Sequence, residues 1–137
     1  MRIIADTNIL LRDALHDDEE QWPQAAMALQ KAEIVAVPTV ALCEFVWVLR
    51  KGYKLPANEI AESLRLLLSS QNVVANWPAT EAGLRMLETG GDFADGVLQY
   101  EGEWLGGEEF VSFDRKAVTL LKGQGKRARV LGATRRM

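Results

Sequence analysis

The stretch that decides the fold opens the chain and reads Ile3-Ile4-Ala5-Asp6-Thr7-Asn8. Its β-branched start predicts a short strand over residues 1–5, and the polar residues that follow mark the carboxyl end of that strand. Asp6 has two interpretations at this point. It either caps a short helix that begins near Ile9 or contributes to a ligand site at the edge of a sheet.

The rest of the chain predicts an α/β fold. Further short apolar runs predict strands at residues 34–37, 72–75, 110–113 and 128–131. Helical periodicity and capping residues predict helices at residues 24–32, 40–51, 57–70, 81–88, 93–105 and 115–121. Because helices separate most of the strands, we expect a three-layer α/β/α sandwich around a central, mostly parallel, five-stranded sheet.

Length and composition point to one ordinary globular unit. The 137 residues, with 48% hydrophobic and 26% charged side chains, contain no repeat or linker, which predicts a single domain over residues 1–137. The longest apolar run, residues 40–49, is shorter than the roughly 20 residues of a membrane helix. The first residues lack a secretory signal and the single Cys43 cannot form an internal disulfide, so we expect a cytoplasmic protein.

Glu44 is the first of three further acidic residues that need an explanation. It is the only charged residue between Pro38 and Arg50, and apolar residues surround it in the sequence. We therefore expect it to be partly buried, where an unpaired carboxylate is costly and favours a bound cation. The alternative is that Glu44 pairs with Arg50 or Lys51 at the helix surface.

Asp95 and Asp114 lie at predicted helix starts. Asp92 and Asp95 have the spacing of a capping box, and Asp95 also follows a glycine pair in the first helical turn, where an anion is favoured. Asp114 follows the fourth predicted strand directly, so it either caps the next helix or lies at the same sheet edge as Asp6. Each feature is weak by itself.

Together, four carboxylates in one pocket require a cation, because like charges cannot all ionise side by side. Hard oxygen ligands select Mg²⁺ or Mn²⁺. The single histidine, His16, lies in an acidic stretch and is expected on a solvated loop, which disfavours zinc.

These residues resemble the motifs of a PIN domain, specifically of a VapC-type toxin of a bacterial toxin-antitoxin pair. The resemblance covers nearly the whole chain and rests on four pieces in order: Ile3 to Leu10, Glu44 to Leu49, Asp92 to Asp95, and Phe110 to Asp114. Two positions depart from the family pattern. Gly96 stands where alanine is usual and is expected to loosen Asp95, and Ser112 stands where threonine is commoner.

The resemblance implies a metal-dependent endoribonuclease, a hydrolase that cleaves RNA. In this interpretation Asp6 and Asp95 bind Mg²⁺ or Mn²⁺ directly, Asp114 binds it directly or through water, and Glu44 orients or deprotonates the attacking water. Asp92 and the hydroxyls of Thr7 and Ser112 would support these acids. The resemblance also implies a VapB-type antitoxin as partner and a homodimer.

Basic residues are concentrated at the end of the chain, where residues 115–137 contain eight of the 16 Lys and Arg residues and no Asp or Glu. They are the candidates for binding RNA phosphates: Arg115, Lys116, Lys122, Lys126, Arg127, Arg129, Arg135 and Arg136. The alternative is a solvated surface or a site for an acidic partner. The tryptophans are expected in the core or at interfaces, and none is assigned to RNA.

Two other functions compete with the nuclease. A catalytically silent PIN-like scaffold that binds nucleic acid or protein would keep the fold without the chemistry. A phospho-receiver domain would place an acidic phosphoacceptor after the third strand, where Asn76 and Trp77 stand. The sequence therefore disfavours the receiver and leaves the scaffold open.

Overall fold

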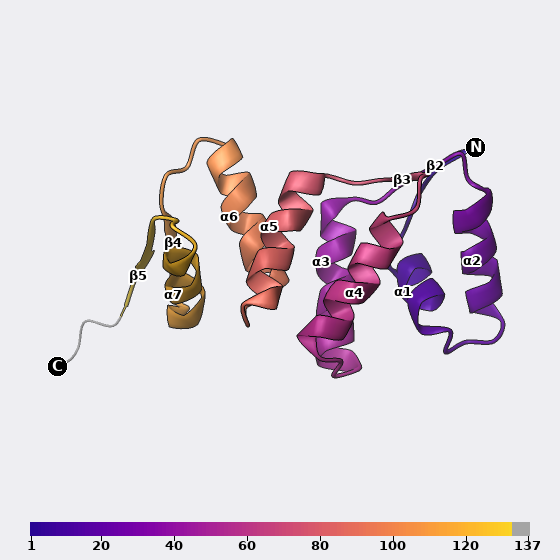
Figure 1. Ribbon diagram of the computed structural model, residues 1–137, viewed down its shortest axis with the longest axis horizontal. Coiled ribbons are helices and arrows are strands. Elements are labelled where there is room, and N and C mark those ends of the chain that lie inside the picture. The colour runs from indigo at the N-terminus through magenta and orange to yellow at the C-terminus, as the bar shows by residue number, and fades with distance from the viewer. Residues whose placement is uncertain (133–137) are drawn as a thin grey trace. The chain divides into compact units, whose positions relative to one another are not determined.

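A computed structural model describes residues 1–132, and in it the chain forms two compact units. The first comprises residues 1–76 and the second begins at Trp77. Figure 1 labels their helices and strands in chain order. The single domain expected from the sequence stays a prediction.

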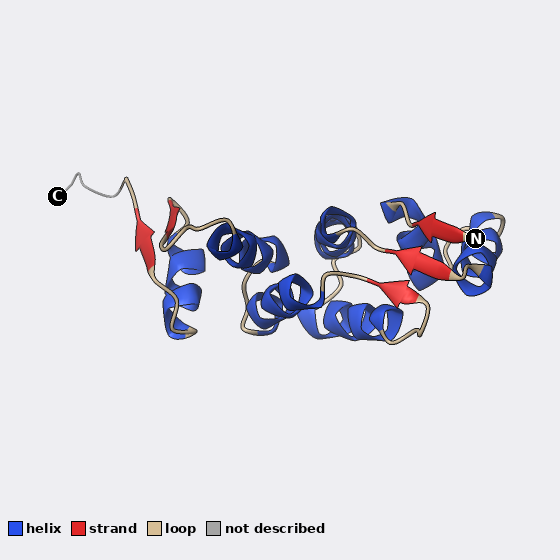
Figure 2. Ribbon diagram, turned by 90° about the horizontal axis from the view of Figure 1, so that it is seen from above, coloured by secondary structure: helices blue, strands red, loops and turns tan. Residues whose placement is uncertain are grey.

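The first unit is a parallel sheet with helices. Its elements are β1 (Arg2–Ile4), α1 (Thr7–Leu15), α2 (Gln21–Lys31), β2 (Ile34–Ala36), α3 (Thr39–Trp47), the π-helix η1 (Val48–Gly52), α4 (Ala57–Leu68) and β3 (Val73–Val74). The strands pair in the order β1-β2-β3, all parallel, with Ile3 opposite Val35 and Val35 opposite Val73. Figure 2 shows these three strands side by side.

Apolar side chains from four elements bury the middle of this unit. Val35 on the central strand is fully buried, as are Leu10 on α1, Phe45 on α3 and Leu64 on α4. Ala5, directly after β1, is buried and its N–H donates to the Ala36 carbonyl oxygen at 2.9 Å, which fixes the backbone before Asp6 at the carboxyl end of the strand.

The second unit contains two helices followed by a small sheet. Its elements are α5 (Trp77–Glu88), α6 (Phe93–Trp104), β4 (Phe110–Ser112), α7 (Arg115–Gly123) and β5 (Ala128–Val130). Strands β4 and β5 pair in parallel, with Phe110 opposite Ala128. Met86 from α5 and Val118 and Leu121 from α7 are buried in one apolar cluster, which places the start of α7 against the rest of the unit.

The predicted α/β class and the parallel pairing are confirmed, but the single five-stranded sheet is not. The described residues form one sheet of three strands and another of two. All five predicted strands exist, and each is one or two residues shorter than its apolar run. The three-layer sandwich around one sheet therefore stays a prediction.

Helix starts differ most from the sequence prediction, and proline explains two of the differences. Helix α2 begins at Gln21 rather than residue 24, and α5 begins at Trp77 rather than residue 81. Pro23 and Pro78 lie in the first turns of these helices, where a backbone N–H has no helical partner and proline is tolerated. Helix α1 begins directly after Asp6, and the predicted helix over 40–51 changes to a π-helix at Val48.

Candidate active site

Asp6 occupies the N-cap position of α1 without using its side chain as a cap. Its backbone is extended, and its carboxylate makes no capping hydrogen bond to the helix. The side chain is exposed. The interpretation of Asp6 as an ordinary helix cap is therefore not supported, and its carboxylate oxygens are available for a ligand.

Glu44 is joined to the end of β1 by a hydrogen bond. Thr7 Oγ1 donates to Glu44 Oε1 at 2.7 Å, across 37 positions of sequence. The expected burial of Glu44 is wrong: its side chain is exposed, because α3 buries a different side, with Leu42 and Phe45. Among the described residues its partner is the Thr7 hydroxyl, and the alternative of a pair with Arg50 or Lys51 is not what the structure shows.

In the second unit, Asp92 and Asp95 lie at the start of α6. Asp92 is the N-cap and its Oδ1 accepts a hydrogen bond from the Ala94 N–H at 3.2 Å. Asp95 lies in the first turn and is partly buried. Burial raises the pKa of Asp95, and the negative charges of Asp92 and Asp114 raise it further. These three carboxylates therefore repel one another within one unit.

Asp114 caps α7, as one interpretation of the sequence predicted. Its Oδ1 accepts a hydrogen bond from the Ala117 N–H at 3.1 Å, and its own N–H donates to Ser112 Oγ at 2.9 Å. Ser112 thus fixes the backbone of Asp114 at the end of β4. One carboxylate oxygen of Asp114 serves the helix, which leaves the other for a cation.

Gly96 holds α6 close to α5. A Cβ at this position would overlap the carbonyl oxygen of Ala82 on α5. The expectation that Gly96 loosens Asp95 has no support, because the missing side chain is what allows the two helices to touch directly after Asp95. Glycine here is a packing requirement.

The donors suit Mg²⁺ or Mn²⁺ in chemical type, but no group of three is assembled. Among residues 1–132, no three His, Cys, Asp or Glu side chains lie close enough together to hold a metal ion. Asp6 and Glu44 belong to the first unit, and Asp95 and Asp114 to the second. Hard carboxylate oxygens and the repulsion around Asp95 nevertheless fit a divalent cation, which would neutralise that repulsion.

Several of the basic residues expected to bind RNA are paired with acids. Lys126 lies 3.6 Å from Glu103, Arg127 lies 3.8 Å from Glu108, and Arg129 contacts Glu109 at 3.2 Å. Arg115 and Lys116, beside Asp114, and Lys122 are exposed on α7. Arg135 and Arg136 lie outside the described residues.

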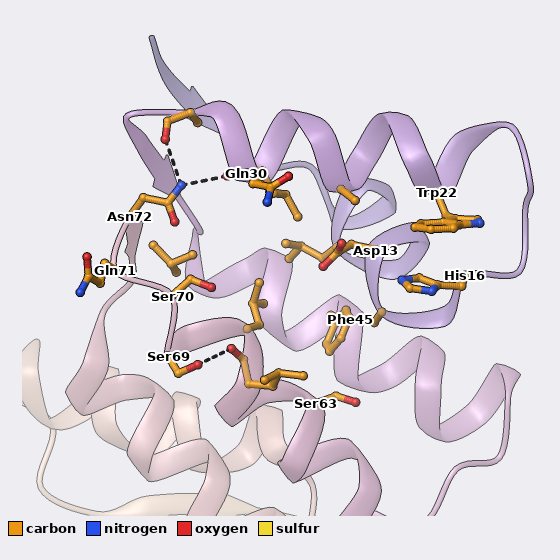
Figure 3. A pocket seen from close by; sticks show the side chains of 18 residues that line it. Asp13, His16, Trp22, Gln30, Phe45, Ser63, Ser69, Ser70, Gln71 and Asn72 are labelled. Carbon is orange, nitrogen blue, oxygen red and sulfur yellow. Dashed lines mark hydrogen bonds between the residues drawn. The ribbon is translucent and has the colours of Figure 1, made fainter.

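A cavity of about 860 Å³ in the first unit, seen from close by in Figure 3, is lined by none of the candidate acids. His16, exposed and directly after α1 as its acidic stretch predicted, stacks on Trp22 at the cavity wall with ring centroids 4.0 Å apart. The sequence did not single out Asp13, which also lines the cavity. Burial raises the pKa of Asp13, and the charge of nearby His16 partly opposes this.

Asp13 illustrates what the sequence reasoning missed. Its only signal is an acidic residue one turn before the single histidine, on a helix that begins at Thr7 rather than near Ile9. Trp47, which the sequence predicts in the core or at an interface, is 61% exposed and so does not lie in the core. Within residues 1–132, no helix is both long and apolar enough to cross a membrane.

Comparison with known proteins identifies the family. The PIN domain profile matches residues 3–98, a range that includes Asp6, Glu44 and Asp95 and ends before Asp114. No protein among those with curated descriptions matches the chain. PIN domains are nuclease-type domains that generally act as hydrolases. Since the match covers more than half of the sequence, this chain belongs to the PIN domain family.

Proposed function

We propose that this protein is a metal-dependent endoribonuclease that hydrolyses RNA phosphodiester bonds. The observation that carries the proposal is the PIN domain match, because three of the four carboxylates chosen on physical grounds fall inside it. The free carboxylate of Asp6 and the Thr7–Glu44 hydrogen bond support the same interpretation.

The proposal assigns a role to each acid. Asp6 and Asp95 would hold Mg²⁺ or Mn²⁺ directly, and Asp114 would hold it directly or through water. Such a cation supplies charge neutralisation for the phosphate and lowers the pKa of a bound water.

Glu44 would orient the attacking water and accept its proton. Its Oε1 accepts the hydrogen bond from the Thr7 hydroxyl, so Oε2 would be the oxygen that accepts the proton. Thr7 therefore positions Glu44, while Ser112 and the cap of α7 position Asp114. Asp92 adds negative charge beside Asp95.

The direct test is cleavage of a labelled RNA pool by the purified wild-type protein with Mg²⁺, with Mn²⁺ and with EDTA. We expect metal-dependent cleavage that Asp6→Asn abolishes and that Glu62→Gln, at an exposed acid on α4, leaves unchanged. Absence of cleavage with either metal, in protein shown to be free of a co-purified partner, would contradict the proposal and favour the silent PIN-like scaffold.

We further infer a biological role as the toxin of a type II toxin-antitoxin system, with a VapB-type antitoxin and a homodimeric state. The support is the likeness of the motifs to VapC-type toxins. Expression of the wild-type chain should then arrest growth, and Asp6→Asn should relieve the arrest. An Asp6→Asn variant that remained toxic would contradict the toxin role without contradicting the nuclease.

A further inference from the structure

An aromatic and basic strip continues from Glu44 along the same helix. Trp47 follows Glu44 by three residues on α3, and Lys51 follows Trp47 by four in η1, so all three share one side. All three side chains are exposed, Trp47 to 61%. The α-helical rise of about 1.5 Å per residue sets an upper bound of about 10 Å on the axial distance from Glu44 to Lys51, because the rise is smaller in the π-helix η1.

Trp47 differs from two other tryptophans in its surroundings. Trp22 is partly buried and already stacked on His16. Trp104 is 78% exposed, but the residues that follow it, Leu105 to Gly107, carry no charge. Trp47 is followed by basic residues instead, which makes its exposed ring suited to a base of a nucleic acid.

The basic residues beyond Trp47 are also different in kind from those near the end of the chain. Within residues 1–132, Lys51 and Lys54 form no ion pair, whereas Lys126, Arg127 and Arg129 each contact a glutamate. An ammonium group without an acidic partner can neutralise a phosphate without first losing an existing contact. Lys51 and Lys54 therefore offer the stronger attraction for a polyanion.

We propose that Trp47, Lys51 and Lys54 form a binding strip for single-stranded RNA that leads the strand to Glu44. The Trp47 ring stacks on one base, and the two lysines neutralise phosphates on the flanking nucleotides. The span from Glu44 to Lys51 matches at most about three stacked nucleotides at about 3.4 Å each. The inference rests on the proposed function, which gives Glu44 its catalytic role. RNA binding by the strip can nevertheless be measured without cleavage.

The test uses the full chain carrying Asp6→Asn, so that RNA is bound and not cut. Binding of a fluorescent single-stranded RNA is compared in this background for Trp47→Ala, Trp47→Phe and Trp104→Ala. We expect Trp47→Ala to weaken binding about 5- to 150-fold, because one base loses its stacking partner. Trp47→Phe keeps a stacking ring and should stay within a few-fold of the parent, as should Trp104→Ala.

The lysines are tested through salt dependence. Replacing Lys51 and Lys54 together by Gln should lower the slope of log affinity against log salt by about 1.4, since each lost phosphate contact on a single strand is worth about 0.7. Replacing Lys126 and Arg127 by Gln is the matched control and should change the slope less. Equal slopes for the two double variants would overturn the role of Lys51 and Lys54.

Three outcomes would overturn the strip as a whole. The first is equal affinity of Trp47→Ala and its parent for single-stranded RNA. The second is an equal loss for a duplex of the same sequence, because paired bases cannot stack on Trp47. The third is a Trp47→Ala variant that loses its dimer and keeps its RNA affinity, which would make this side a protein interface.

Failure of the strip and failure of the proposed function give different results. Metal-dependent cleavage with unchanged kcat and KM in Trp47→Ala would support the nuclease and contradict the RNA-binding strip. Trp47-dependent RNA binding by a protein that never cleaves would keep the strip and contradict the nuclease.

Discussion

Thr7 and Glu44, 37 residues apart in the sequence, are joined by a 2.7 Å hydrogen bond between the Thr7 hydroxyl and Glu44 Oε1. This contact ties the carboxyl end of β1 to the middle of α3. It also explains how an exposed glutamate on an otherwise apolar helix is held in one orientation. The geometry of Glu44 therefore depends on the residue directly after Asp6.

Removal of the Thr7 hydroxyl should impair the orientation of Glu44 while leaving the fold largely intact. We expect Thr7→Val to lower the single-turnover cleavage rate about 10-fold, the usual cost of losing a group that orients a catalytic residue. Thr7→Ser should restore most of the rate, because it keeps the donor. Urea denaturation should show a loss of only about 1 kcal/mol for Thr7→Val. A Thr7→Val enzyme with a wild-type rate would exclude the positioning role.

Asp114 should show two separable roles. Asparagine caps helices about as well as aspartate, so Asp114→Asn should keep the stability of the protein and lose cleavage. Asp114→Ala should lose cleavage and also about 0.5–2 kcal/mol of the free energy of unfolding. Both quantities can be measured on the same purified variants. Full activity in Asp114→Asn would show that the carboxylate acts only as a cap.

Two glycines of α6 should respond in opposite directions to alanine. Gly96→Ala should destabilise the protein by about 1–3 kcal/mol, because the new methyl group overlaps the Ala82 carbonyl. Gly102 has open space at its Cβ position, so Gly102→Ala should stabilise α6 by about 0.5–1 kcal/mol. Urea denaturation measures both. A Gly96→Ala variant at least as stable as wild type would contradict the close packing of α5 and α6.

The sequence predicts the individual helices and strands better than it predicts how they assemble. Runs such as Ile34 to Val37 predicted strands correctly because β-branched residues suit a buried parallel sheet. The start of α5 was missed because Pro78 looks like a helix breaker, although it is harmless in a first turn. The positions of Asp6, Asp95 and Asp114 could be predicted, since all three stand at or next to the start of a helix.

What the sequence did not give was the environment of individual side chains. Apolar neighbours along the chain suggested that Glu44 is buried, but on a helix only every third or fourth residue faces the same way. The Thr7 contact and the overlap at Gly96 depend on residues distant in sequence, so no local pattern could reveal them. The same is true of the cavity around Asp13.

Asp13 should make stability depend on pH. Burial raises its pKa in the folded protein, so the folded state holds the proton more tightly than the unfolded chain. The charged form is therefore penalised, and stability is lost as pH rises from the usual aspartate range through the raised pKa. Asp13→Asn should be more stable than wild type at pH 7, and this advantage should shrink toward pH 3. Thermal denaturation across this range measures it, with Glu62→Gln as the control; an advantage that grew at low pH would contradict the assignment.

The measurement that tests the central claim most directly is Mn²⁺ binding, followed by titration calorimetry, to wild type, Asp6→Asn, Asp95→Asn and the double variant. If Asp6 and Asp95 bind the same cation, each single variant should weaken the same binding event about 10-fold or more, and Glu62→Gln should not. Two separate binding events, one removed by Asp6→Asn and the other by Asp95→Asn, would contradict a shared active site.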